Sequence, residues 1–75
     1  MNNKYSPISC QLYDRLEEFA VKKIKIKINY FDENCMENIV EDFIIDLKTK
    51  EKEEFLILLN KLEIRLDRIK YIEKI

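Results

Sequence analysis

Three carboxylates and one phenol lie close together near the start of the chain, at Tyr13, Asp14, Glu17 and Glu18. Two carboxylates can perform general acid–base catalysis, and a row of them can bind a basic protein surface. Catalysis is the weaker interpretation, because 15 Asp and Glu residues among 75 form pairs by chance. The sequence also contains no histidine and no glycine-rich phosphate loop. We therefore expect a protein that is not an enzyme.

The two thiols, Cys10 and Cys35, do not form a CxxC motif. A structural zinc site needs about four cysteine or histidine ligands, so we expect no metal and no cofactor. A helix N-terminus can lower the pKa of a thiol such as Cys10, but a small apolar residue packed beneath the helix is the favoured interpretation. A disulfide between the two cysteines stays open, and free thiols in a reducing cytoplasm are favoured.

Basic residues cluster in residues 22–27, which contain four lysines and no acid: Lys22, Lys23, Lys25 and Lys27. Such a stripe can bind RNA. A surface that binds single-stranded RNA also needs interleaved aromatic residues on which bases stack, and here only Tyr30 and Phe31 lie near one end. The net charge of −1 also argues against nucleic-acid binding in general. A solvated strand face, protected by its lysines against edge pairing, is the favoured interpretation, and no direct nucleic-acid contact is expected.

The carboxylates near the start are positioned by a predicted helix over about residues 10–20. Residues 1–8 form an extended lead-in, because Pro7 disfavours the helical region for Ser6. Ser9 is a good N-cap. One apolar face follows at helical spacing, made of Leu12, Leu16, Phe19 and Ala20. The acids then point outward, and a plain solvent face is the simplest interpretation of them.

A strand is predicted next, because apolar and polar residues alternate from Lys23 to Tyr30. Asp32-Glu33-Asn34 is expected to form the turn after it. The chain has no glycine, so its tight turns are expected to use Asn or Asp.

The segment of residues 35–47 is ambiguous, and its pattern favours a helix. The helical stripe consists of Met36, Ile39, Val40, Phe43, Ile44 and Leu47. Residues 48–54 are expected to form a charged connector, and residues 55–59 a strand. Two further strands are predicted from Leu62 and from Ile69, separated by a break near Asp67 and Arg68.

Three stretches of the sequence carry a resemblance to a known family. The pattern Tyr5-x-Pro7-Ile8-x-Cys10-x-x-Tyr13-Asp14-x-Leu16-Glu17 resembles the N-terminal signature of the Rho-binding antiterminator family. Asp46-Leu47 with Glu54-Phe55-Leu56, and residues 64–69 (IRLDRI), resemble two later family segments. The chain departs from the family pattern at Asp32-Glu33-Asn34, where the family has an Asp-Gly turn, and in a longer stretch before Asp46.

The resemblance implies one domain over residues 1–75, mostly β with one N-terminal helix. Its core would be a small Sm-like or SH3-like β-barrel over about residues 21–75. Residues 35–48 would then be a long, bent second strand with a bulge, in place of the helix that the pattern favours.

The resemblance also implies a function. The family binds the N-terminal RNA-binding domain of the transcription terminator Rho and keeps it from loading on RNA. Asp14 and Glu17, which match the motif, would pair with basic residues of Rho, and Tyr13 would pack beside them. Glu18 lies outside the motif and is the weaker candidate.

Two alternatives stay open at this point: an Sm-like RNA-binding module that uses the lysines of residues 22–27, and another small regulatory protein, such as a toxin–antitoxin component, that uses the same acidic helix. We expect a cytoplasmic protein that is monomeric when free. No apolar stretch is long enough for a membrane span or a secretory signal.

Overall fold

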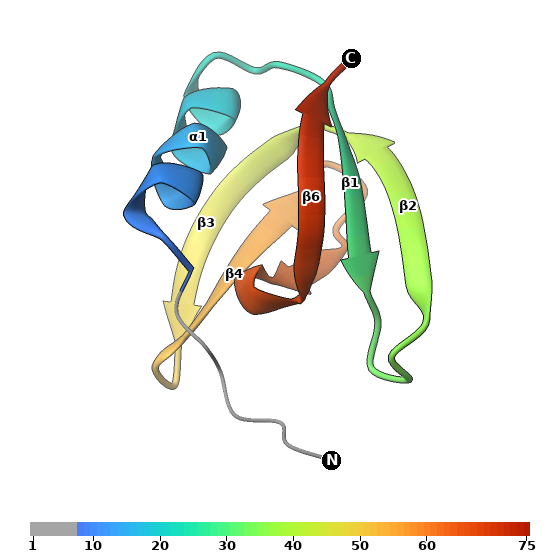
Figure 1. The fold of residues 1–75 in the computed structure, drawn as a ribbon. Helices are drawn as coiled ribbons and strands as arrows, with labels where there is room; N and C mark the ends of the chain where they lie inside the picture. Colours follow the sequence, from blue (N-terminus) through green and yellow to red (C-terminus); the bar gives the residue numbers. More distant parts are fainter. Residues whose placement is uncertain (1–7) are drawn as a thin grey trace.

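The structure, a computed structural model, describes residues 8–75 and consists of one helix followed by six strands (Figure 1). The lead-in expected over residues 1–8 therefore lies outside the described residues, except for Ile8. The elements are α1 (Cys10–Val21), β1 (Ile26–Phe31), β2 (Glu37–Asp42), β3 (Ile44–Lys50), β4 (Glu53–Leu58), β5 (Glu63–Arg65), the 3₁₀ helix η1 (Leu66–Arg68) and β6 (Ile69–Lys74).

The helix α1 begins where the sequence predicts. The hydroxyl of Ser9 accepts a hydrogen bond from the main-chain N–H of Leu12 at 3.1 Å, which satisfies one of the free donors of the first turn. Leu16 and Phe19 are buried, and the predicted apolar face is confirmed.

The expectation that Cys10 packs beneath the helix is wrong, because Cys10 is exposed. Cys10 lies six positions before the buried Leu16, and on a helix with 3.6 residues per turn the two point to different sides. Cys35, like Cys10, is exposed.

The six strands form two antiparallel sheets of three strands each, with the orders β2-β1-β6 and β3-β4-β5. The prediction of a mostly β protein with one N-terminal helix is confirmed. No strand pairing within residues 8–75 closes the two sheets into a barrel. The chain passes from the first sheet to the second at Phe43, between β2 and β3.

The prediction of a helix over residues 35–47, which the pattern favours, is wrong. This segment contains β2 and the first half of β3, which belong to different sheets. Val40 faces the core from β2, whereas Ile44 and Leu47 face it from β3 across a register shift between Ile44 and Asp46. Read along the sequence, the core-facing residues of the two strands are spaced three to four positions apart, which is the spacing of a helical face. The resemblance implies strand structure here, which is confirmed, but the expected single long, bent strand is wrong: β2 and β3 are separate strands on either side of Phe43 and belong to different sheets.

The connector expected over residues 48–54 is a tight hairpin, in which only Glu51 and Lys52 lie between β3 and β4. Both have positive φ angles, 51° and 67°. Within residues 8–75, positive φ angles also occur at Lys23, Cys35 and Lys61. The expectation that tight turns use Asn or Asp is confirmed at Asp32-Glu33-Asn34 and wrong at the β3–β4 hairpin. The side chains with positive φ occupy a backbone region that costs about 1–2 kcal/mol per residue.

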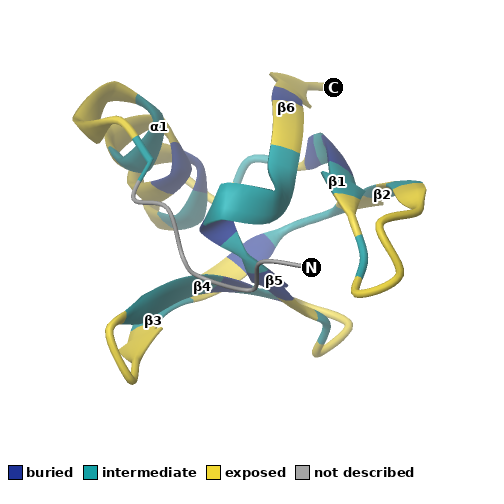
Figure 2. Ribbon diagram, turned by 60° about the horizontal axis from the view of Figure 1, so that its bottom comes forward, coloured by how far each residue is buried: buried dark blue, intermediate teal, exposed yellow. Residues whose placement is uncertain are grey.

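The core lies between the helix and the two sheets, as the buried segments of Figure 2 show. Its fully buried side chains are Leu16, Ile26, Ile28, Leu56, Leu58 and Leu66. The predicted alternation of β1 is confirmed at Ile26 and Ile28, although the strand begins at Ile26 and not at Lys23.

One polar side chain, Asn29, is buried beside these apolar residues, next to a register shift between β1 and β6. Its Nδ2 donates a hydrogen bond to Oε1 of Glu37 at 3.1 Å. That bond, followed by the hydrogen bond from Lys70, lowers the pKa of Glu37. The Oδ1 atom of Asn29 is buried without a hydrogen-bond partner within residues 8–75.

Candidate partner-binding surface

The three carboxylates of the helix are exposed, but they differ in their partners. Glu18 forms an ion pair with Lys22 one turn later, with 2.8 Å between Oε2 and Nζ. The hydrogen bond from Lys22, followed by its charge, lowers the pKa of Glu18. Within residues 8–75, neither Asp14 nor Glu17 forms an ion pair. These two carboxylates are therefore available to a partner, and Glu18 is partly neutralised.

Tyr13 lies half-buried at the edge of the core, beside these acids. Burial raises the pKa of its phenol, and the negative charges of Glu54 and Glu17 raise it further. The phenol is therefore protonated at neutral pH and can donate a hydrogen bond. Glu54 comes from β4, so the acidic environment of Tyr13 is made by two elements distant in the sequence.

A groove separates the helix from β3, and we call it the α1–β3 groove. It has a volume of about 320 Å³ and is lined by Tyr13, Glu17, Ala20, Val21, Ile45, Asp46 and Leu47. The structure thus brings two of the predicted site residues, Tyr13 and Glu17, together with side chains of β3. Sequence reasoning missed the β3 residues because it favoured a helix there.

A second cavity of about 430 Å³ adjoins the α1–β3 groove and shares Ala20 and Ile45 with it. Its other lining residues are Lys23, Phe43, Ile44 and Leu59. Val21, Leu59 and Ile45 expose 80%, 57% and 47% of their surface. An apolar strip therefore runs along the seam between α1 and the second sheet.

The four lysines of residues 22–27 do not form one strand face, so this part of the sequence interpretation is wrong. Lys22 caps α1 and pairs with Glu18. Lys23 lies in the turn after the helix, with a φ of 55°, and Lys25 precedes β1. Lys27 alone lies within the strand, where it pairs with Glu73 at 3.7 Å. The cause is that the helix continues to Val21 and the strand begins later than predicted.

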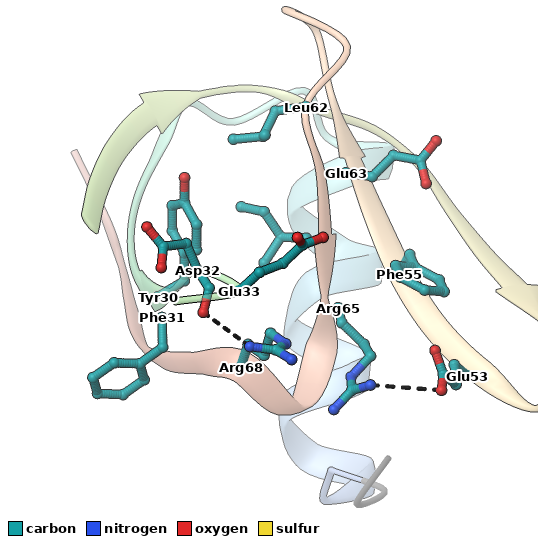
Figure 3. A pocket seen from close by; sticks show the side chains of 11 residues that line it. Tyr30, Phe31, Asp32, Glu33, Glu53, Phe55, Leu62, Glu63, Arg65 and Arg68 are labelled. Atoms are coloured by element: carbon teal, nitrogen blue, oxygen red, sulfur yellow. Dashed lines mark hydrogen bonds and ion pairs between the residues drawn. The ribbon is translucent and has the colours of Figure 1, made fainter. Parts of the chain in front are cut away.

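A third cavity, of about 390 Å³, lies where the end of β1 faces β4, β5 and η1 (Figure 3). Aromatic, acidic and basic side chains line it, among them Tyr30, Phe55, Glu33, Arg65 and Arg68. Sequence reasoning did not predict this cavity, and used residues 64–69 only as a family match and to predict two strands with a break between them.

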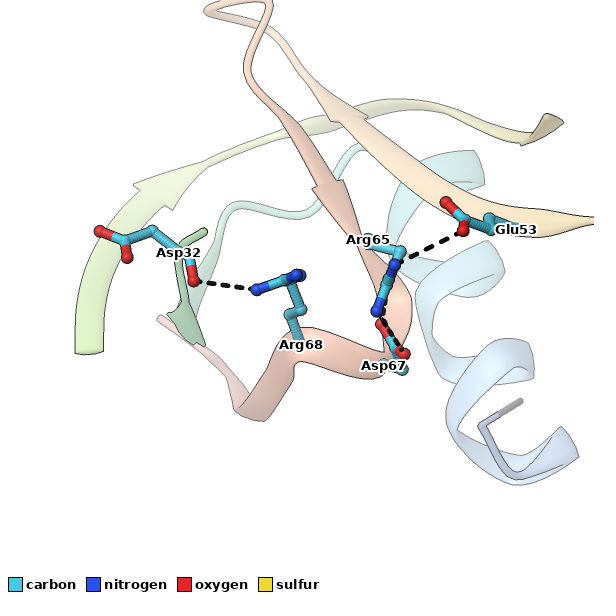
Figure 4. Close-up of polar contacts among 5 residues, drawn as sticks. All are labelled: Asp32, Glu53, Arg65, Asp67 and Arg68. Atoms are coloured by element: carbon cyan, nitrogen blue, oxygen red, sulfur yellow. Dashed lines mark hydrogen bonds and ion pairs between the residues drawn. The ribbon is translucent and has the colours of Figure 1, made fainter. Parts of the chain in front are cut away.

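Both arginines of this cavity are held by the protein itself (Figure 4). Arg65 binds the carboxylate of Asp67 through Nε at 2.6 Å and Nη2 at 3.0 Å. Its Nη1 lies 3.5 Å from Oε2 of Glu53. Arg68 donates from Nη1 to the main-chain oxygen of Asp32 at 2.9 Å. These contacts fix η1 between the two sheets, which is a structural role.

Residues 8–75 contain no cluster of three or more histidine, cysteine or acidic side chains that could hold a metal ion. In the same range, the helices are too short or too polar to cross a membrane.

The chain matches no protein-family model, no curated protein and no solved structure. The resemblance to the Rho-binding antiterminators is therefore untested by these comparisons and stays a prediction from the motif residues. Tyr5 and Pro7 of that motif lie outside the described residues. Cys10, Tyr13, Asp14, Leu16 and Glu17 all lie in α1.

Proposed function

We propose that this chain is a non-catalytic inhibitor of the terminator Rho, which binds the N-terminal RNA-binding domain of Rho through Asp14 and Glu17 of α1. The observation that carries the proposal is the exposure of these two carboxylates without an ion-pair partner within residues 8–75. The match of α1 to the family motif supports the choice of partner. The Sm-like or SH3-like barrel implied by that motif is part of the proposal.

The charge arrangement supports this mechanism. A protein surface that binds RNA presents lysine and arginine to the phosphates. Carboxylates on a short, rigid helix can occupy the same positions as phosphates, and they exclude RNA by competition. Asp14 and Glu17 lie three positions apart, so they face a partner from one side of α1. The protonated phenol of Tyr13 adds a hydrogen-bond donor beside them.

Competition for Rho tests the proposal. Purified full-length Rho is loaded with fluorescent C-rich RNA, and the chain is added at low ionic strength. We expect the RNA to be released, with a fall in its fluorescence anisotropy. The variant Asp14→Lys/Glu17→Lys is expected to lose this effect while keeping its melting temperature, since both side chains are exposed.

The matched control is Glu33→Lys/Glu41→Lys, which changes the net charge equally at two exposed acids of the β1–β2 hairpin. The control is expected to displace RNA as well as the unmodified chain does. An equal loss of RNA displacement in both variants would mean that binding to Rho depends on net charge alone. Retained displacement by Asp14→Lys/Glu17→Lys would refute the assignment of these two carboxylates to the interface. A shift of the labelled RNA by the chain without Rho would instead favour a direct RNA-binding module.

A further inference from the structure

The apolar strip beside the acidic helix has no function in the proposal so far. Val21 and Ile45 face solvent on opposite sides of the α1–β3 groove, from the end of the helix and from β3. Leu59 extends the strip past Ala20 through the adjoining cavity. Exposed apolar side chains occur singly on most proteins, but a continuous strip with a groove is typical of an interaction site.

The charged side chains that line the α1–β3 groove are both negative. They are Glu17 and Asp46, one from the helix and one from β3. Asp46 is exposed, and its Oδ1 accepts a hydrogen bond from the main-chain N–H of Leu47 at 2.8 Å, which fixes the carboxylate at the rim. The opposite end of the strip has Lys23. A partner that fits this surface has an apolar side chain with cationic groups beside it.

We infer that the α1–β3 groove receives a bulky apolar side chain from the RNA-binding surface of Rho, flanked by arginine or lysine residues that meet Glu17 and Asp46. The inference rests on the proposed function and adds a second, apolar part to the same interface. Surfaces that bind single-stranded RNA combine cationic residues with aromatic side chains on which bases stack. The groove is complementary to that combination, since it places apolar walls between carboxylates.

Other occupants fit the groove less well. RNA itself would bring phosphates next to Glu17 and Asp46, and an anionic membrane would meet the same repulsion. A basic protein surface removes the repulsion and also covers Val21 and Ile45. Apolar anchors in the centre of an interface commonly contribute most of its affinity.

The test is the variant Val21→Ser/Ile45→Ser, measured for binding to full-length Rho by titration of the labelled chain. We expect its Kd to rise roughly tenfold or more, the loss typical of truncated interface anchors. The control is Ile39→Ser, which removes an isoleucine at least as exposed as Ile45 from β2, on the far side of the molecule from α1 (Figures 1 and 2). The Kd of the control is expected to stay unchanged.

A second readout reports contact directly. The δ1 methyl groups of the isoleucines are labelled for NMR, and Rho is added in steps. We expect the signal of Ile45 to shift or broaden before that of Ile39, which contacts no part of the groove.

The outcomes separate the inference from the proposed function. Tight binding by Val21→Ser/Ile45→Ser, with an undisturbed Ile45 methyl, would overturn the inference and leave the charge-based proposal standing. Loss of binding in this variant but not in Asp14→Lys/Glu17→Lys would support the apolar contact, and it would refute the role of Glu17 both in the proposed function and at the groove. No binding of the unmodified chain to Rho would overturn both.

Discussion

Arg68 donates a hydrogen bond from its Nη1 atom to the main-chain oxygen of Asp32, at 2.9 Å and across 36 positions of the sequence. The bond joins η1 to the turn between β1 and β2. The carboxylate of Asp32 organises that turn, since its Oδ1 accepts from the main-chain N–H groups of Asn34 and Met36. Its Oδ2 accepts from the side chain of Asn38 at 2.9 Å. One residue therefore holds a hairpin turn that contains no glycine.

The first prediction concerns the acid stability that Asp32 provides. The main-chain hydrogen bond from Met36, then that from the Asn38 side chain, lowers the pKa of Asp32 below its ordinary value. A carboxyl whose pKa is lower in the folded state stabilises the fold above its unfolded pKa of about 3.9, and this contribution disappears as the pH falls through the folded pKa. Asp32→Ala should thus lower the melting temperature at pH 7, with a smaller difference from the unmodified chain below about pH 4.

The control for this prediction is Glu33→Ala, the exposed neighbour in the same turn. It should leave the melting temperature nearly unchanged at both pH values. A deficit of Asp32→Ala that is equally large at pH 7 and pH 3 would show that the ionised carboxylate is not responsible.

The second prediction concerns the bidentate pair of Arg65 and Asp67. Their side chains are 12% and 10% exposed, so the pair is shielded from water much more than the surface pairs are. Asp67→Ala should reduce the free energy of unfolding by about 2 kcal/mol, because it leaves a charged donor group poorly satisfied. Chemical denaturation measures the change. Lys48→Ala, which removes the exposed Lys48–Glu63 pair, should cost less than about 1 kcal/mol. Equal costs for the two variants would refute the assigned role of burial.

The third prediction uses the hairpin between β3 and β4. Glu51 and Lys52 both have positive φ, the geometry for which an Asn-Gly pair is preferred in two-residue turns. Glu51→Asn/Lys52→Gly should raise the free energy of unfolding by roughly 1 kcal/mol, since it relieves the steric cost of the left-handed region. Glu33→Gly, at a turn position without positive φ, should instead lower it, because glycine loses more entropy on folding. Thermal unfolding of both variants shows whether each substitution raises or lowers the stability.

Local signals made much of this fold predictable. Ser9 and the spacing from Leu12 to Ala20 located the helix, because an N-cap and an apolar stripe act within a few residues. The alternation at Ile26 and Ile28 located β1, and the break before Ile69 is present as η1. Each of these features depends on neighbours in the sequence.

The segment around Phe43 was not predictable in the same way. Its two halves join different sheets, and the side of each strand that faces the core is decided by β1 and β4, which are far away in the sequence. The groove was missed for the same reason. Val21 and Ile45 line one groove only because α1 packs against β3, and no local pattern encodes that packing.

The last prediction concerns the salt dependence of Rho binding and the separate contributions of Glu17 and Glu18. Exposed charges are screened within about 8 Å at physiological ionic strength, so an interface that depends on Asp14 and Glu17 should weaken as KCl is raised. Glu17→Gln should weaken binding by about 0.5–1 kcal/mol at low salt and should flatten the salt dependence. Titrations at several KCl concentrations measure both effects.

Glu18→Gln is the matched comparison, because Glu18 lies next to Glu17 but is already paired with Lys22 at 2.8 Å. A carboxylate with a cation of its own contributes little net charge to a partner, so this variant should bind Rho almost as the unmodified chain does. Removal of the Glu18 carboxylate also leaves Lys22 without this ion pair, and the charge of Lys22 would repel a basic partner. The affinity of the variant for Rho should therefore fall slightly at most. A larger loss for Glu18→Gln than for Glu17→Gln would reverse the assignment and place the contact on the side of the helix that faces Lys22.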